Sequence, residues 1–388
     1  MELGFETRGA HKNVLSEARR RLVRGRAGMI GRLLVVLLGG AALLTAVTPM
    51  GRYLARGAIA EGQILWRRQS IERMVADPAT DAPTRAKLRL VLEARRFAED
   101  SLGLPAKDAF TQFTRLEHDT LVLVLSGAYR DQLRPVTWWF PIVGRVPYRG
   151  YFDFAEAKQA EQALAAEGYD TYLRPSPAFS TLGFFNDPLL STTLGEDSLD
   201  IVNTVVHELT HNRFYAKGQA VFNESFASFV GARGAERFWL SRGDTARARR
   251  AADRWADDVL LGAIWERTYT ALDSAFTAHP GAAARAIRVA LRDSVYAHVR
   301  TLLVDSIAPQ WRSIDRRSAT RMRLDNSALL ARRIYATGLD DFEGVYGAEG
   351  GEVRRTIKRV IAIANAAPGD PGAAVRDAMR GGVKSLPR

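Results

Sequence analysis

The chain has 388 residues, of which 47% are hydrophobic and 25% are charged, as in a globular protein that can bury a large core. It contains no cysteine, which excludes a disulfide framework, a thiolate metal site and a lipid anchor on an N-terminal cysteine. The formal charge is +12, but acids are interspersed among the arginines in helix-like stretches. We therefore interpret the arginines as solvated helix faces and expect no nucleic-acid partner.

The N-terminal stretch has the charge pattern of an exported protein. Residues 1–32 contain eight Lys or Arg and three acids, and an uncharged apolar stretch of 16 residues, 33–48, follows. A basic flank before an apolar core keeps the N-terminus in the cytoplasm and sends the rest of the chain across the membrane. No Ala-x-Ala cleavage site is evident just after the core, so we predict a signal anchor that contacts the membrane through residues 33–50; a cleaved signal is the alternative. Residues 1–52 are the predicted leader and anchor, and residues 53–388 the predicted catalytic domain.

The first half of the predicted domain combines helices and short strands. Apolar residues recur at helical spacing over residues 53–103, with breaks at Asp77-Pro78 and Pro83, which predicts a helical packing platform. Residues 121–125 read as a short buried strand. Residues 136–142 and 145–152 read as paired strands with turns at Pro141 and Gly144.

The next segments predict a helix over residues 153–167, a strand over 169–173 and a loop-rich stretch over 175–193. We expect that loop-rich stretch near a cleft mouth, and interpret its aromatics Phe179, Phe184 and Phe185 as core residues in preference to a substrate pocket. After Glu224 the pattern is helical almost to Ala366, and residues 368–388 are predicted to be poorly ordered.

The most informative stretch is Val-Val-His-Glu-Leu-Thr-His, residues 205–211. Two histidines four apart lie on one helix face, so His207 and His211 can reach one metal ion while Glu208 points at the metal's open side. No proline or glycine interrupts residues 199–217. A catalytic zinc ion needs a third protein ligand, and Glu224, on a second helix-like segment after a turn at residues 217–219, is the candidate. The whole pattern, HExxH, twelve residues, then Glu, is far more restrictive than the five-residue motif.

These motifs resemble a known signature. His-Glu-Leu-x-His followed by Asn-Glu-x-Phe-Ala-Ser, residues 223–228, is similar to the glutamate-zincin pattern of thermolysin-related aminopeptidases, in which the interval between histidine and glutamate is longer. Together with residues 148–152 and 180–183, the run 207–231 resembles a family of bacterial envelope proteins known as predicted aminopeptidases, over about residues 53–366. The resemblance implies a zincin-like fold of the α+β class, mostly helical, with a small sheet beside the HExxH helix. It also implies a bacterial envelope protein, and with the charge pattern of residues 1–48 we expect an inner-membrane protein with a periplasmic catalytic domain, or a periplasmic protein if the signal is cleaved.

Such a site predicts peptide hydrolysis with Zn²⁺ as cofactor. Zinc lowers the pKa of water and polarises the scissile carbonyl, and Glu208 acts as general base. Residues 326–346 resemble the family's C-terminal motif, and within them Asn326 and Tyr335 are candidate oxyanion donors; Tyr335 as an ordinary core residue is the alternative. The other histidines considered, His118, His279 and His298, lack ligand spacing, so we interpret them as surface or satisfied core residues.

Three functions stay open from the sequence. The favoured one is an aminopeptidase acting on peptides. However, the Gly-x-Met-x-Asn string that holds the substrate amine in well-studied glutamate-zincin aminopeptidases is absent, which leaves an endopeptidase as an alternative. The other alternative is a non-catalytic, membrane-tethered interaction protein with a structural metal. Glu208 favours catalysis, because a structural site has no need of a carboxylate on its open side.

Overall fold

The computed structural model describes residues 39–40, 48–116, 122–140, 144–176, 188–195 and 197–380. The chain divides into two units, Met1–Gln63 and Ile64–Arg388. Helix α2 (Pro49–Trp66) forms most of the described part of the first unit. None of the helices in the described ranges is long and apolar enough to cross a membrane. Most of the apolar stretch 33–48 lies outside those ranges, so the anchor and the domain boundary at residue 52 stay predictions.

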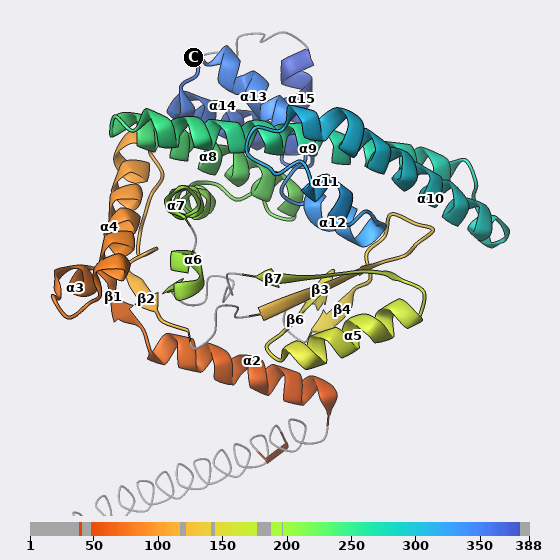
Figure 1. Ribbon diagram of the computed structural model, residues 1–388, viewed down its shortest axis with the longest axis horizontal. Helices are drawn as coiled ribbons and strands as arrows, with labels where there is room; N and C mark the ends of the chain where they lie inside the picture. The colour runs from red at the N-terminus through yellow and green to blue at the C-terminus, as the bar shows by residue number, and fades with distance from the viewer. Residues whose placement is uncertain are drawn as a thin grey trace, which may run out of the picture. The chain divides into compact units, whose positions relative to one another are not determined.

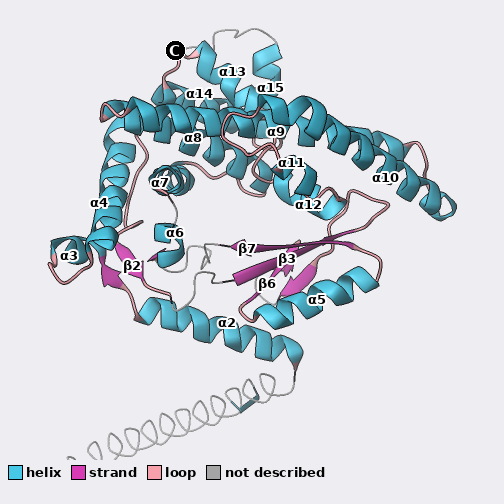
Figure 2. Cartoon of the chain, viewed as in Figure 1, coloured by secondary structure: helices cyan, strands magenta, loops and turns pink. Residues whose placement is uncertain are grey.

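The second unit is mostly helical, as predicted, with three small sheets (Figures 1 and 2). Its α-helices are α3 (Ile71–Ala76), α4 (Ala82–Phe97), α5 (Phe154–Ala166), α6 (Ser191–Gly195), α7 (Ser198–Arg213), α8 (Ala220–Ser241), α9 (Thr245–Thr277), α10 (Arg285–Leu302), α11 (Ser318–Arg321), α12 (Asn326–Arg333), α13 (Leu339–Ala348), α14 (Val353–Ala366) and α15 (Pro371–Arg380). Short 3₁₀ or π segments cover Ala98–Leu102, Ala282–Ala284, Leu303–Ile307 and Ala308–Gln310.

The strands form three separate sheets. The first has the order β1-β2-β8, from β1 (Gln69–Ser70), β2 (Gln112–Thr114) and β8 (Leu189–Leu190). The second is antiparallel with the order β6-β3-β7, from β6 (Tyr148–Tyr151), β3 (Val122–Ala128) and β7 (Asp170–Ser176). The third pairs β4 (Trp138–Phe140) with β5 (Gly144–Val146). Within the β6-β3-β7 sheet, β7 is an edge strand.

Helices α7 and α8 lie at the centre of the second unit. Helix α7 packs against α4 and α8, and α8 packs in turn against α9 and α13. Aromatic rings of Phe226 and Phe229 on α8 contact Phe342 on α13, at centroid separations of 5.6 and 5.8 Å. Burying a phenylalanine side chain contributes about 1.5–3 kcal/mol, so this cluster holds α8 firmly against the outer helices.

Helix α7 begins where the sequence offers a strong cap. The Asp197 side chain accepts hydrogen bonds from the backbone N–H groups of Leu199 (2.7 Å) and Asp200 (3.2 Å). Arg254 on α9 donates hydrogen bonds to the side-chain carboxylates of Asp197 (2.6 Å) and Asp200 (2.7 Å), and these bonds join the start of α7 to α9. The helix ends at Arg213, where the next residue, Phe214, has an extended backbone (φ −153°). The absence of proline and glycine would have allowed it to continue to residue 217.

Several predictions about segments need correction. The tail is not wholly irregular, because α15 forms over Pro371–Arg380 and buries Val375 to 1% exposure in the main core. Pro83 does not break a helix but lies in the first turn of α4, where its missing N–H costs nothing. Residues 188–195 contain β8 and α6, whereas the sequence predicted loop through residue 193.

The strand pairing was only partly predictable. Trp138–Phe140 does pair with Gly144–Val146, and Gly144 supplies a positive φ of 72° at the turn. Residues 148–151, however, pair with β3 and not with 136–142. The sequence predicted a small sheet beside the HExxH helix; the β6-β3-β7 sheet packs mainly against α5 and α12. The predictions for Leu121, for Pro141 and for the aromatics at 179, 184 and 185 fall outside the described residues.

Candidate metal site

Three predicted ligands converge between α7 and α8. The Nε2 atom of His207 lies 3.3 Å from one carboxylate oxygen of Glu224, and that of His211 lies 3.6 Å from the other. Donor atoms of the three residues all lie within 4.8 Å of one another, which makes them a group that could hold a metal ion. Glu208, beside the first histidine, is exposed. The structure therefore brings the three predicted ligands together, with Glu208 next to His207 on α7.

The turn that aims Glu224 is held by its neighbour Asn223. The Asn223 side chain is 2% exposed and bonds both backbone groups of Ala216: its Oδ1 accepts from the Ala216 N–H and its Nδ2 donates to the Ala216 carbonyl, each at 2.8 Å. Helix α8 has no side-chain cap at Gln219, so these bonds fix where the helix begins. The sequence patterns assigned Asn223 no role of its own, although it stands in the Asn-Glu motif.

A glycine lets the two helices approach at the site. A Cβ atom added to Gly231 on α8 would lie 2.3 Å from Oδ1 of Asn203, 3.0 Å from the Asn203 carbonyl oxygen and 3.2 Å from Cβ of His207. The backbone oxygen and the histidine cannot both move without shifting α7. Gly231 therefore allows the short distance between helices that brings Glu224 to the histidines.

Charge and burial act against each other in this cluster. Burial alone would raise the pKa of Glu224, but hydrogen bonds from His207 and His211 hold that pKa at about 2. For His211, burial lowers the pKa, and the carboxylate of Glu224 outweighs that effect and raises it. The His211 Nδ1 atom is buried with no hydrogen-bond partner among the described residues. The site is thus a compact carboxylate–imidazole cluster.

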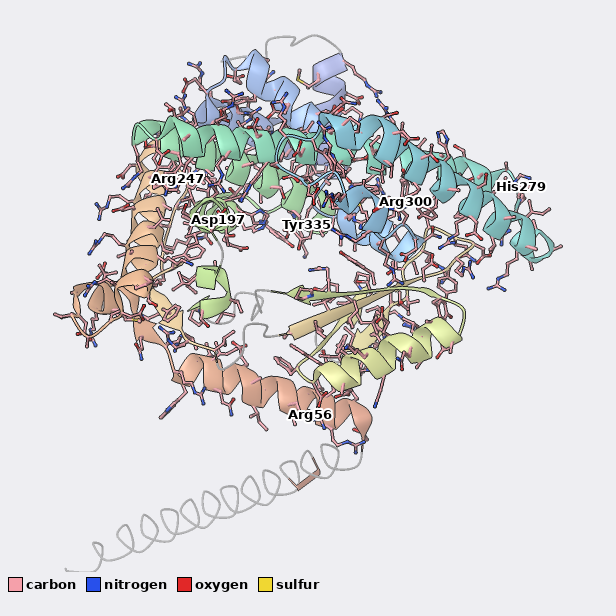
Figure 3. All side chains as sticks on the ribbon, viewed as in Figure 1. Arg56, Asp197, Arg247, His279, Arg300 and Tyr335 are labelled. Atoms are coloured by element: carbon pink, nitrogen blue, oxygen red, sulfur yellow. The ribbon has the colours of Figure 1, made fainter. Side chains whose placement is uncertain are left out.

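Tyr335 follows α12 and lies beside the cluster. Its ring centroid is 6.5 Å from that of His207, and 42% of the residue is exposed, so it is not an ordinary core residue. Figure 3 shows Tyr335 between the helices and β7. Burial of the phenol within the fold and the charge of Glu224 raise its pKa, which keeps the hydroxyl protonated.

A buried serine holds this tyrosine segment on α8. The Ser225 hydroxyl donates to the Ile334 carbonyl (3.3 Å) and accepts from the Thr337 N–H (3.1 Å), on either side of Tyr335. Ser225 directly follows Glu224 in the chain. One turn of α8 therefore carries the carboxylate and also anchors the phenol.

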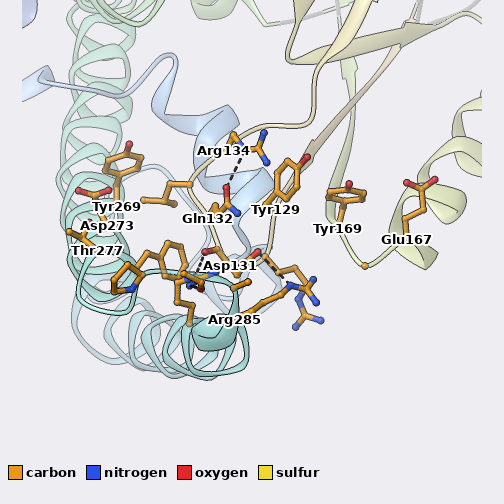
Figure 4. A pocket seen from close by; sticks show the side chains of 18 residues that line it. Tyr129, Asp131, Gln132, Arg134, Glu167, Tyr169, Tyr269, Asp273, Thr277 and Arg285 are labelled. Carbon is orange, nitrogen blue, oxygen red and sulfur yellow. Dashed lines mark hydrogen bonds and ion pairs between the residues drawn. The ribbon is translucent and has the colours of Figure 1, made fainter.

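A cavity of about 390 Å³ lies beside Tyr335, and its wall contains none of the three candidate ligands. Ser228, one helical turn after Glu224 on the same face of α8, lines it together with Tyr335. Asp258 on α9 lines it too. The residue is exposed, while desolvation of the carboxyl and the neighbouring Asp257 raise its pKa to about 7. A second cavity of about 760 Å³ lies between the loop after β3, the turn before β7, and helices α9 and α10, and it too has none of the cluster residues in its wall (Figure 4).

Asn326, the other candidate oxyanion donor, is not at the site. It is completely buried at the start of α12, where its Oδ1 accepts from the Tyr296 hydroxyl and its Nδ2 donates to the Tyr129 carbonyl, both at 2.8 Å. These bonds give it a structural role. His279 bonds the Ala275 carbonyl at 3.0 Å and His298 is exposed, as predicted, while His118 lies outside the described residues.

Comparison with known families supports the resemblance seen in the motifs. A sequence model of the family described as putative aminopeptidase matches residues 52–371, most of the chain. The chain belongs to the putative aminopeptidase family. No curated protein and no solved structure matches it significantly. Membership in the putative aminopeptidase family suggests a peptidase acting on peptide substrates and is compatible with a metal at the cluster.

Proposed function

We propose that this protein is a zinc-dependent peptidase whose ligands are His207, His211 and Glu224 and whose general base is Glu208. The convergence of two imidazole nitrogens and a carboxylate beside an exposed glutamate carries the proposal. Family membership supports it independently.

The donor set fits zinc. Ligand atoms at 2.0–2.1 Å from a tetrahedral zinc ion lie about 3.3 Å apart. One Glu224 oxygen lies 3.3 Å from His207 Nε2 and the other lies 3.6 Å from His211 Nε2, and ligand atoms of the three residues lie within 4.8 Å of one another. Two neutral imidazoles with one carboxylate are a common catalytic zinc set, and three protein ligands leave a position for substrate or water. When bound, zinc supplies a Lewis acid that polarises a carbonyl group and makes water more acidic.

The remaining chemistry falls to side chains of this chain. The exposed Glu208 carboxylate can take a proton from the attacking water and pass it to the leaving amine. The Tyr335 hydroxyl, kept protonated by its raised pKa, can donate a hydrogen bond to the oxygen on which negative charge develops. Ser225 positions that hydroxyl through its two backbone bonds.

The Glu208→Gln variant tests this proposal. Glutamine keeps the size of the side chain but cannot accept the proton, so hydrolysis of a peptide library should fall at least about a hundredfold while bound zinc stays the same. Unchanged hydrolysis would mean that another group activates the water. No hydrolysis by zinc-loaded wild-type protein would favour the non-catalytic interaction protein instead.

Within this function we propose an aminopeptidase, as the family description suggests. Matched peptides with free and acetylated N-termini, analysed by mass spectrometry, separate the alternatives. Loss of cleavage on acetylation supports an aminopeptidase because a free amine then contributes to recognition. Equal cleavage of both forms, or internal cuts in casein, identifies an endopeptidase.

We also propose that the catalytic unit works in the periplasm, held by an N-terminal segment in the inner membrane. The basic residues before position 33 and the apolar stretch after them support this orientation. Protease added to spheroplasts should degrade residues 64–388. Protection of that region would contradict the envelope location.

A further inference from the structure

The cavity beside Tyr335 has two arginines in its wall. Arg174 on the edge strand β7 and Arg332 on α12 both line it. Arg174 is half-buried, and none of the other described residues makes an ion pair or hydrogen bond with its guanidinium. It shares the cavity wall with Tyr335, and its charge acts on the Tyr335 phenol. The donors of this guanidinium are therefore available to a ligand in the cavity.

Arg332 is held in place without an acidic partner. Its Nη1 donates to the Arg323 carbonyl at 2.6 Å, and its guanidinium carbon lies 4.8 Å from the Trp265 ring centroid. Burial lowers the pKa of this arginine, so part of the hydration of the cation has been lost. Stacking on an aromatic face leaves the edge of a guanidinium free to make paired hydrogen bonds. The second arginine is thus an oriented and only partly satisfied donor.

The charge of the cavity favours an anion. Asp258 is the acid in the wall, and the charged groups that act on it are Asp257, Arg254 and Asp200, not the two cavity arginines. Asp258 is exposed, so solvent screens its negative charge, and its raised pKa weakens that charge further near neutral pH. Two arginines and one screened acid make the cavity favourable for a negatively charged group.

We propose that this cavity is a substrate subsite in which Arg174 and Arg332 bind a carboxylate of the peptide. The carboxylate belongs either to an acidic side chain or to the free C-terminus of a short peptide, since both present the same two oxygens to a guanidinium. The proposal rests on the peptidase function proposed above. It adds a preference for peptides that carry a carboxylate within reach of the scissile bond.

Binding to the zinc-loaded Glu208→Gln protein tests the subsite without turnover. Isothermal titration calorimetry would compare tetra-alanine amide with tetra-alanine bearing a free C-terminus, and with amides carrying one glutamate at the first, second or third position. At least one carboxylate peptide should bind about tenfold to a hundredfold more tightly than tetra-alanine amide, as expected for hydrogen bonds between charged groups. The peptide that gains identifies the source of the carboxylate.

The arginine variants then locate the effect. Arg174→Gln, in the same protein, should remove most of the gain, and Arg174→Lys should keep part of it because charge remains but the fork of donors is lost. Arg249→Gln is the matched control, because Arg249 lies on α9 with 85% of its side chain exposed and its replacement changes net charge equally. Circular dichroism and Tm confirm that each variant is folded.

Two results would overturn the subsite: no gain for any carboxylate peptide, or a gain that survives Arg174→Gln. Hydrolysis by the wild-type protein is measured separately. If it cleaves nothing but shows the binding gain, the peptidase proposal fails and the subsite stands. If it cleaves peptides without any carboxylate preference, only the subsite fails.

Discussion

Replacing Asn223 tests whether the turn between α7 and α8 positions the metal ligand. In Asn223→Ala the Ala216 N–H loses the acceptor that lies at 2.8 Å, and an unsatisfied donor costs about 1–3 kcal/mol. The Ala216 carbonyl loses one bond but still accepts from the Gln219 N–H at 3.1 Å, so that loss costs about 1 kcal/mol. We expect a total loss of about 2–4 kcal/mol and a fall in Tm of about 3–6 °C.

Asn223→Asp is the matched variant. It keeps the oxygen that accepts from the Ala216 N–H, but its second oxygen would bring a buried negative charge against the Ala216 carbonyl, so its loss should be at least as large as that of the alanine variant. Because Glu224 is the next residue, zinc affinity measured by competition with a chelator should fall about tenfold or more in both variants. An alanine variant with wild-type Tm and wild-type zinc affinity would refute the role of this turn.

Three further variants probe neighbouring parts of the site. Gly231→Ala should lower the free energy of unfolding by about 1–2 kcal/mol and weaken zinc binding, because the added Cβ collides with α7, although alanine favours a helix. Gly347→Ala is the control: its Cβ meets nothing within 4 Å, so Tm should not fall. Equal changes in Tm for the two variants would contradict this explanation. Ser225→Ala should lower kcat about tenfold with zinc retained, and should add nothing in a Tyr335→Phe background; a further loss there would mean that Ser225 acts elsewhere. In the folded protein the pKa of Asp258 is raised to about 7, so its contribution to folding stability is complete below the pKa of the unfolded chain and is lost as the pH rises through 7. The gain in Tm on replacing Asp258 by asparagine should therefore grow from pH 4 to pH 8. A gain that stays constant with pH would contradict this.

Local sequence patterns predicted the parts of the site that depend on local geometry. Spacing on one helix determines that His207 and His211 share a face, and the turn at Gly218, with φ 77°, was visible as punctuation between two apolar runs. The interval to Glu224 then brought the third ligand into place. The resemblance added Tyr335, which no local pattern would have selected.

The features that the sequence did not reveal depend on contacts between distant segments. Ser225 acts on residues 109 and 112 positions away. Arg174 and Tyr335 line one cavity because β7 packs against α12, which Tyr335 follows. Helix α15 was missed because its stability comes from burying Val375 against the core, which a polar tail composition does not indicate. Asn326 was misjudged because its side chain is consumed by bonds to Tyr296 and Tyr129 across the fold.

Metal content gives the most direct test of the central claim that His207, His211 and Glu224 form one zinc site. Zinc per chain would be measured by inductively coupled plasma mass spectrometry after dialysis, for the wild-type protein and for His211→Ala, with His279→Ala as a control distant from the cluster. We predict one zinc ion per chain in the wild type and in the control, and almost none in His211→Ala. Equal zinc in His211→Ala and the wild type would contradict the proposed site.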